Sequence, residues 1–259
     1  MMVAGFILVG QCSLSPAKPD PIVNRKSSIV NQPMRRVVIP ELLDTDAGTR
    51  DEIRGSLRDL RFFNSWFGGV PTTAALLEDV ARQTGQRSFS LLEVAAGSGY
   101  VAGRTHDILR RRGIKLAPTL LDRSPSHLTG LWPAVAGDAL ALPFADNSFD
   151  LVGCNLFVHH LEPEEVTRFA REALRVCRAA VLINDLIRHP LHLLLVYAGF
   201  PLYRSRITRN DAPASVRRAY TMEEMRALLA ASGAARLDFS RHYLFRMGVI
   251  AWKKAPCTT

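Results

Sequence analysis

From Phe89 to Ile183 the sequence alternates between short apolar runs and longer amphipathic stretches, and this alternation limits the possible folds more than any other feature. Short apolar runs bounded by small residues are typical of buried strands, and the stretches between them have helical periodicity. We expect strands at residues 90–94, 117–121, about 134, 151–155 and 179–183, and helices at 100–112, near Ser126 and at 163–176. This order predicts an α/β fold with a doubly wound, mostly parallel sheet and helices on both faces.

The remaining C-terminal sequence predicts the edge of that sheet. We expect an apolar helix at 191–203, a polar loop as far as Ala219, and a helix at 222–232 with Thr221 as its N-cap. Strands at 236–241 and 244–252 follow each other closely enough to form an antiparallel edge. The helix at 191–203 is too apolar for an ordinary surface helix. It is either covered by N-terminal helices, borders a site for a lipid-like substrate, or touches a membrane surface.

The N-terminal part divides into a tail and a helical segment. Residues 1–33 are rich in Pro, Ser and Asn without periodicity, so we predict a disordered tail. A helix with Phe63 and Trp66 on its apolar face, ended by Gly68-Gly69, and a second helix at 73–84 are expected next. We predict that 34–85 forms a helical lid segment and 86–254 the main domain. The helices pack against the core, or their aromatic residues cover an apolar substrate.

Charge and cysteine content only partly restrict the protein's possible partners and cellular compartment. The net charge of +9 is spread along the chain and suits an anionic small molecule, a membrane surface or nucleic acid equally. No basic-aromatic tract is present, so we expect no nucleic-acid partner. Four widely spaced cysteines, without histidines at metal-binding spacing, predict reduced thiols and no metal site. We expect a cytoplasmic protein without an integral membrane segment, and the sequence predicts no particular oligomeric state.

The stretch from Ser90 to Tyr100 predicts a ligand site. A buried strand ends at Glu93-Val94 and passes into a turn with Gly97 and Gly99, where a ligand can approach the backbone because no Cβ interferes. Asp122 ends the next strand and is placed to accept hydrogen bonds from ribose hydroxyls, and Asp138 can accept from an exocyclic amine. Three carboxylates would repel a pyrophosphate, so they favour a ligand that carries an amine or a sulfonium.

These residues resemble the motifs of the class I S-adenosylmethionine-dependent methyltransferases. Residues 91–99, Leu-Leu-Glu-Val-Ala-Ala-Gly-Ser-Gly, resemble the first motif, and Leu-Asp-Arg-Ser-Pro at 121–125 the second. Residues 137–152 are similar to the third and fourth motifs of small-molecule members related to the ubiquinone and menaquinone methyltransferases. The resemblance covers 91–185 well and implies a seven-stranded, Rossmann-like methyltransferase fold.

The resemblance also implies roles for individual residues and S-adenosylmethionine as the cofactor. Glu93 would lie near the methionine amine, Asp122 would bind the ribose, and Asp138 with Ala139 would hold the adenine. The motif positions of Arg123 and Asn155, and of the turn residues Ala95, Gly97 and Gly99, place them among the cofactor-binding residues as well. Ala95 stands where the family has its first glycine, and its methyl group would tighten the pocket slightly. A Pro-Gly-Gly turn common before the fifth strand is also missing from 176–180.

The reaction end of the site is expected after the fourth and fifth predicted strands, because ligands of open α/β sheets bind at the carboxyl ends of strands. The polar candidates there are Asn155, His159, His160, Asn184 and Asp185. A phenol or enol acceptor must lose a proton, and a histidine suits that task near neutral pH. We therefore predict His159 or His160 as the catalytic base, with His189 and His192 as weaker candidates. Arg209, Arg217 or Arg218 can neutralise an anionic acceptor.

The sequence therefore predicts methyl transfer from S-adenosylmethionine to a small, phenolic or quinone-like apolar acceptor, with O-methylation favoured over C-methylation. One alternative is a nicotinamide-dependent oxidoreductase, because residues 97–102 also fit the GxGxxA fingerprint, with Asp122 about twenty residues further on. Another is a catalytically inactive methyltransferase-like binding protein. Glu93 and the 137–152 run count against the oxidoreductase, which needs neither.

Overall fold

A computed structural model describes residues 34–45, 47–125, 128, 132–243 and 245–254. The tail at 1–33, the helix expected near Ser126, Cys12 and Cys257 lie outside the described residues. Cys154 and Cys177 are buried free thiols, as predicted.

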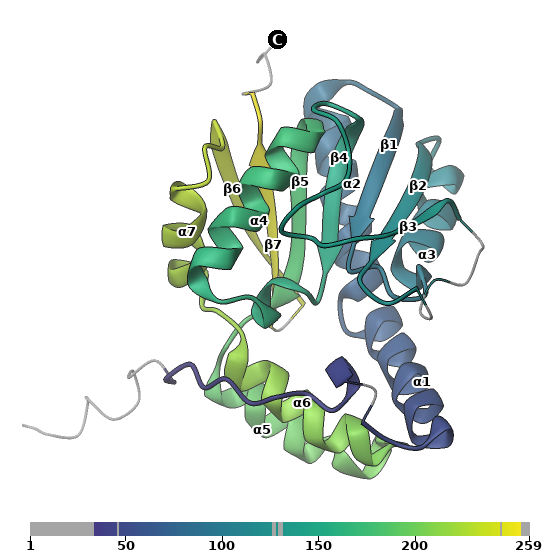
Figure 1. The fold of residues 1–259 in the computed structure, drawn as a ribbon, viewed down its shortest axis with the longest axis vertical. Helices are drawn as coiled ribbons and strands as arrows, with labels where there is room; N and C mark the ends of the chain where they lie inside the picture. The colour runs from purple at the N-terminus through teal and green to yellow at the C-terminus, as the bar shows by residue number, and fades with distance from the viewer. Residues whose placement is uncertain (1–33, 46, 126–127, 129–131, 244, 255–259) are drawn as a thin grey trace, which may run out of the picture. The chain divides into compact units, whose positions relative to one another are not determined.

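The strands are β1 (Ser88–Val94), β2 (Lys115–Asp122), β3 (Ala134–Ala136), β4 (Phe149–Asn155), β5 (Cys177–Leu186), β6 (Arg236–His242) and β7 (Arg246–Trp252). They form one seven-stranded sheet in the order β3-β2-β1-β4-β5-β7-β6. Strands β1 to β5 pair in parallel, whereas β7 runs antiparallel to both β5 and β6. The predicted mostly parallel sheet with an antiparallel C-terminal edge is therefore confirmed (Figure 1).

The α-helices are α1 (Arg50–Trp66), α2 (Gly69–Thr84), α3 (Tyr100–Arg111), α4 (Pro163–Val176), α5 (Pro190–Ala198), α6 (Arg206–Arg218) and α7 (Met222–Ala230), and short 3-10 turns are η1 (Leu43–Thr45), η3 (Val158–His160) and η4 (Phe200–Leu202). Their first turns have clear sequence signals. Thr49 and Glu52 form a capping box at the start of α1, and Thr221 and Glu224 form another at α7. The N-cap predicted at Thr221 is thus confirmed.

The core has two layers because successive strand residues point to opposite faces of the sheet. Helices α4 and α7 cover one face, where Leu92 and Val94 of β1 pack with Phe169 of α4. Helix α2 covers the other face, where Leu91 packs with Leu77. Burial of a side chain of this size contributes about 1.5–3 kcal/mol. By this alternation Glu93, two residues after Leu91, belongs to the α2 face.

A cap lies beyond the carboxyl ends of β1, β4 and β5. Figure 1 shows α1, α5 and α6 together on this side of the sheet, with the N-terminal strap, residues 34–45, running across α6. Asp211 of α6 accepts hydrogen bonds from the backbone N–H groups of Leu42 and Leu43 at 2.8 and 3.0 Å. Asp59 of α1 accepts from the N–H groups of Arg204 and Ser205. Buried carboxylates therefore join the strap, α1 and α6.

The cap contains the main error of the sequence-based secondary structure. The polar loop expected before Ala219 is wrong, because residues 206–218 form α6. Ser205 caps this helix by accepting the N–H of Ile207, and Pro213 lies inside it. A proline removes a helical hydrogen bond, so the helix depends on tertiary contacts such as that of Asp211 with the strap. The helix expected at 191–203 is instead divided into α5 and η4.

Candidate functional site

The turn after β1 has the open geometry that the sequence predicts. Gly97 and Gly99 have φ angles of +52° and +67°, values that favour glycine. A Cβ on Gly99 would lie 2.5 Å from Cδ1 of Leu120, whereas a Cβ on Gly97 would meet no atom within 4 Å. Gly99 is therefore required by packing, and Gly97 faces open space where a ligand can approach the backbone.

Asp122 connects this turn to the segment that follows β2. Its carboxylate is almost fully buried and accepts hydrogen bonds from the N–H groups of Gly97, at 2.8 Å, and Ser124, at 2.9 Å. Its backbone carbonyl accepts from the N–H of Gly137 at 3.0 Å. The structure thus brings Gly97, Asp122 and the turn before Asp138 together.

Asp138, Ala139 and Arg123 border this region more loosely. The exposed carboxylate of Asp138 accepts the N–H of Leu140 at 2.9 Å, which is the contact of a turn-forming aspartate. Ala139 is half-buried, and Arg123 is exposed beside Asp122. Asp138 therefore holds its own turn and presents its second oxygen outward.

Glu93 is the buried acid of the site. Burial raises the pKa of its carboxyl to about 8, although the backbone of Ala102 offsets part of that effect. Glu93 Oε2 and Asn155 Oδ1 are both buried without a hydrogen-bond partner among the described residues. Both residues line a small cavity between α2 and the sheet, together with Thr73 and Asn184. Unpaired buried acceptors cost free energy, so this region suits a ligand that brings donors or positive charge.

Ala95 has a left-handed backbone, with φ of +52°. This conformation costs a residue with a Cβ about 1–2 kcal/mol of conformational free energy, whereas it costs glycine almost none. The conformation explains why the resembling family has a glycine at this position. Strained residues of this kind concentrate at functional sites.

His159 and Asp185 form a buried pair at the reaction end. His159, in η3 after β4, places Nδ1 2.6 Å from Asp185 Oδ1, and its backbone N–H donates to Oδ2 at 3.2 Å. Burial alone would raise the pKa of Asp185, but His159 and the N–H of Leu186 outweigh it and hold that pKa below its ordinary value. An ionised Asp185 fixes the imidazole proton on Nδ1, so Nε2 remains a proton acceptor.

Glu41 of the strap faces both histidines. Its carboxylate lies 3.8 Å from His159 Nε2 and 4.0 Å from His160 Nε2, while Nδ1 of His160 lies 3.1 Å from Asp44. Burial raises the pKa of Glu41 to about 7. One ligand atom from each of Glu41, His159 and His160 falls within 4.8 Å of the others, a grouping found once in the described part of the chain. The three residues can therefore exchange protons or hold a divalent cation.

Sequence reasoning missed Glu41, Asn64 and Arg246. Arg246 of β7 is buried and donates to the carbonyl of Phe67 at 3.0 Å, and it approaches Asn184 and Asn64 at 3.4 and 3.5 Å. Asn64 also accepts from Asn155 at 3.2 Å. An arginine inside an apolar strand was the available signal, since buried arginines need polar partners.

Other candidates lie away from the pair of His159 and Asp185. His189 and His192 stack on Phe245, and burial lowers the pKa of His192 to about 4. Arg217 lies over the ring of Tyr197. Of the three candidate arginines, Arg218 comes closest, since it donates to the carbonyl of His160.

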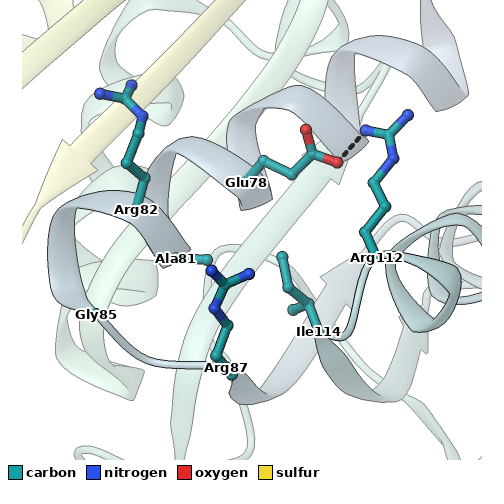
Figure 2. A pocket seen from close by; sticks show the side chains of 7 residues that line it. All are labelled: Glu78, Ala81, Arg82, Gly85, Arg87, Arg112 and Ile114. Carbon is teal, nitrogen blue, oxygen red and sulfur yellow. Dashed lines mark hydrogen bonds and ion pairs between the residues drawn. The ribbon is translucent and has the colours of Figure 1, made fainter.

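A hollow of about 480 Å³ lies at the opposite end of the sheet, near the amino ends of β1 and β2. Figure 2 shows Arg82, Arg87 and Arg112 around it, with Arg112 paired to Glu78. None of the predicted site residues lines this hollow. Ligands of parallel sheets bind at the carboxyl ends of strands, so the hollow is not the candidate site.

Comparison with known proteins identifies a methyltransferase domain in the chain. Residues 92–183 match a family model described as "Methyltransferase domain". The chain is similar to a ubiquinone/menaquinone biosynthesis C-methyltransferase of Roseobacter denitrificans, with 36% identity over 117 residues, which cover 40% of this chain. The match spans only 43% of that relative's length.

Two solved structures have a similar fold at low sequence identity. The C-methyltransferase domain of the citrinin polyketide synthase has a TM-score of 0.53 and 15% identity, and the match covers 72% of this chain and 52% of that one. Human N-acetylserotonin methyltransferase, solved with S-adenosylmethionine, has a TM-score of 0.52 and 14% identity, with coverage of 85% and 63%. These two likenesses concern the fold alone.

Proposed function

We propose that this protein transfers a methyl group from S-adenosylmethionine to a small, apolar acceptor, because residues 92–183 match a methyltransferase domain. One observation carries the proposal. Glu93 Oε2 is a buried, unpaired carboxylate oxygen next to an open glycine turn. Such an oxygen requires a ligand that brings a donor or a positive charge, and the ammonium group of S-adenosylmethionine brings both.

The residues around Glu93 fit the rest of this cofactor. Asp122, whose carboxylate holds the N–H groups of Gly97 and Ser124, would bind the ribose hydroxyls. Asp138 with Ala139 would hold the adenine, while Arg123 and Asn155 would border the cofactor. When bound, the cofactor supplies a methyl group on a positively charged sulfur. The chain has only to bind and orient the two reactants, which supplies much of the acceleration in such a transfer.

His159 would accept the proton that a phenolic or enolic acceptor loses. Asp185 holds Nδ1 at 2.6 Å, which orients the ring and stabilises the imidazolium that forms. Glu41 lies 3.8 Å from Nε2, too far for a hydrogen bond, and its ionised carboxylate would stabilise the imidazolium through charge. His160 is the second candidate base, although its ring is less buried and it is oriented by Asp44 of the strap.

The methylated atom stays a proposal. The sequence pattern favours an oxygen of a phenol, whereas the relative of 36% identity is named as a C-methyltransferase. A base beside the acceptor serves both reactions, because a phenol and an enolisable carbon each lose one proton. We retain O-methylation as the working prediction, together with a cytoplasmic location.

Titration calorimetry with S-adenosylmethionine and S-adenosylhomocysteine, followed by transfer of labelled methyl to a panel of phenols, resorcinols and quinols, tests the proposal. We expect binding that Asp122→Ala weakens by about 10²-fold and that Asp146→Asn, in an exposed turn, leaves unchanged. NMR of the product distinguishes O- from C-methylation. Failure of the wild-type protein to bind either compound would reject the proposal, and binding without transfer to any acceptor would favour the inactive binding protein.

A further inference from the structure

The exposed large apolar side chains are concentrated at one place. Nine of the eleven found among the described residues come from the end of α1, from α5 with η4, and from the β6–β7 turn, and they are Phe62, Trp66, Phe67, Leu191, Leu194, Leu195, Tyr197, Leu202 and Tyr243. Leu202 is 71% exposed, Trp66 66% and Leu194 62%. No residue of α5 is buried. We refer to these nine residues as the apolar surface.

Ring contacts connect the three segments of the apolar surface. Tyr197 contacts Phe200 at 5.2 Å between centroids, and Phe200 contacts Tyr203 at 5.5 Å. Tyr203 contacts Phe63 of α1 at 5.3 Å. The row then continues through Phe67 to Tyr243, at 5.7 and 6.0 Å. These contacts connect α1, α5 with η4 and the β6–β7 turn, and Figure 1 shows α1 and α5 on the same side of the sheet.

The sequence around the apolar surface is rich in arginine. Residues 186–220 contain six arginines and one acidic residue, Asp211, which is buried and binds the strap. Three of the six arginines are paired with carboxylates from outside this stretch, since Arg188 pairs with Glu224, Arg206 with Glu52 and Arg218 with Asp44. Arg204 and Arg209 are exposed next to η4, and Arg58 and Arg61 are exposed beside Phe62 on α1.

We propose that the apolar surface docks on an anionic lipid bilayer, with α5 lying in the plane of the membrane interface. Leucine and aromatic side chains insert at the boundary between headgroups and acyl chains, and flanking arginines bind anionic headgroups. A nine-residue helix is too short to cross a bilayer, and no described helix is long and apolar enough to do so. Docking in the interface therefore accounts for an apolar helix whose Leu191, Leu194 and Leu195 the described part of the protein leaves exposed.

Neither a second copy of the chain nor an acidic protein accounts for the surface equally well. Two copies would bring the exposed arginines Arg204 and Arg209 of one copy close to those of the other. An acidic protein would pair with the arginines but would leave the exposed side chains Leu191, Leu194 and Leu195 of α5 without an apolar partner. The bilayer provides both a charged layer and an apolar layer. This docking goes beyond the proposed methyl transfer and does not rest on it.

Co-sedimentation of the full chain with vesicles tests the proposal. We expect binding to vesicles of phosphatidylcholine with phosphatidylglycerol, weak binding to phosphatidylcholine alone, and loss of binding at high salt. Leu194→Ser/Leu195→Ser should weaken binding by about tenfold or more, and Arg204→Gln/Arg209→Gln should remove most of the preference for anionic vesicles. Val37→Ser/Val38→Ser, which changes exposed residues of the strap, is the matched control and should bind as the wild type does.

Tryptophan fluorescence provides a second readout. Vesicles should shift emission to the blue in the wild type, and Trp66→Phe should lose most of that shift. An unchanged melting temperature shows that the variants are folded, which is expected because the substituted side chains are exposed. Absence of vesicle binding by the wild type, or equal binding by Leu194→Ser/Leu195→Ser, would overturn the proposal. So would a dimer in light scattering that the leucine substitutions dissociate, because the surface would then join two copies.

Discussion

The polar groups of the cofactor half of the candidate site all lie in a short part of the chain, between Glu93 and Asp138. The reaction half instead combines Glu41 of the strap with His159 of η3 and Asp185 of β5. In the first half, neighbouring parallel strands place successive loops side by side, so sequence order fixes their proximity. In the second half, the groups meet only after the strap has crossed α6. The first half can therefore be recognised from a motif, and the second must be found in the structure.

The two halves also differ in what their carboxylates contact. Asp122 accepts backbone N–H groups and therefore shapes the turn that would receive the cofactor. Asp185 and Asp44 each contact a histidine and therefore orient rings. Substitutions in the first half should alter cofactor binding, and those in the second half should alter turnover. Each prediction below tests that separation, in order of decreasing effect.

The largest effect is expected from His159→Asn. The asparagine amide can keep the contact with Asp185 but lacks the proton-accepting Nε2, so kcat should fall by about 10²–10⁴-fold while cofactor affinity stays unchanged. Methyl-transfer kinetics and calorimetry measure the two quantities. His242→Asn, in β6 and paired with Ser240, is the control that should retain full activity.

Two outcomes would contradict this role for His159. A His159→Asn variant with wild-type kcat would show that the base lies elsewhere, and the same substitution in His160 would then be the next test. Activity that dialysis against a chelator removes and Zn²⁺ restores would instead indicate that Glu41, His159 and His160 bind a metal ion.

Asp122→Ala should have the next largest effect, and it should change cofactor affinity rather than kcat. The substitution removes two hydrogen bonds that hold Gly97 and Ser124, together with the proposed ribose contact, so cofactor affinity should fall by about 10²-fold. Asp138→Ala is the matched comparison and should cost less, because its exposed carboxylate holds only its own turn. Equal losses from the two variants in calorimetry would disprove the special role of Asp122.

The difference between the halves also explains what the sequence could predict. The mostly parallel sheet and the proximity of Gly97 to Asp122 follow from local patterns, since each residue lies at the carboxyl end of a strand or in the turn that follows one. Glu41 could not be predicted, because only its contacts with α6, such as the bond from Ser215, place it beside His159. Helix α6 itself was missed because Pro213 and its polar residues are typical of a loop. The helix forms because the folded cap satisfies those residues.

Glu93→Gln should alter the pH dependence of stability and cofactor binding. The carboxyl has a pKa of about 8 in the folded chain and an ordinary value of 4.5, so between these values the folded state holds a proton that the unfolded state has released. Rising pH therefore lowers the free energy of unfolding across this window, by on the order of 2–4 kcal/mol from this residue. In urea denaturation at several pH values, the free energy of unfolding of the variant should therefore fall less steeply with pH than that of the wild type.

Cofactor binding should show the opposite trend in the wild type. A cationic ammonium pairs with the ionised form of Glu93, so affinity should rise with pH toward about 8 and level off above it. The cofactor's own titration affects wild type and variant equally. The difference between their pH profiles in calorimetry is therefore the contribution of Glu93 to the pH dependence of affinity. Identical pH profiles would place the ammonium elsewhere.

Ala95→Gly should have the smallest effect, and it should be stabilising. Glycine relieves the left-handed strain of about 1–2 kcal/mol at φ of +52° but adds about 0.4–1 kcal/mol of unfolded-state entropy, so the net gain should be about 0.5 kcal/mol. Ala96→Gly is the matched control, because the described backbone has no positive φ there and glycine should destabilise the fold by about 0.5–1 kcal/mol. Thermal denaturation compares the two variants. Ala95 lies in the cofactor half, so tighter cofactor binding with an unchanged kcat would agree with the separation of the halves. A changed kcat would show that strain in this turn affects the reaction half.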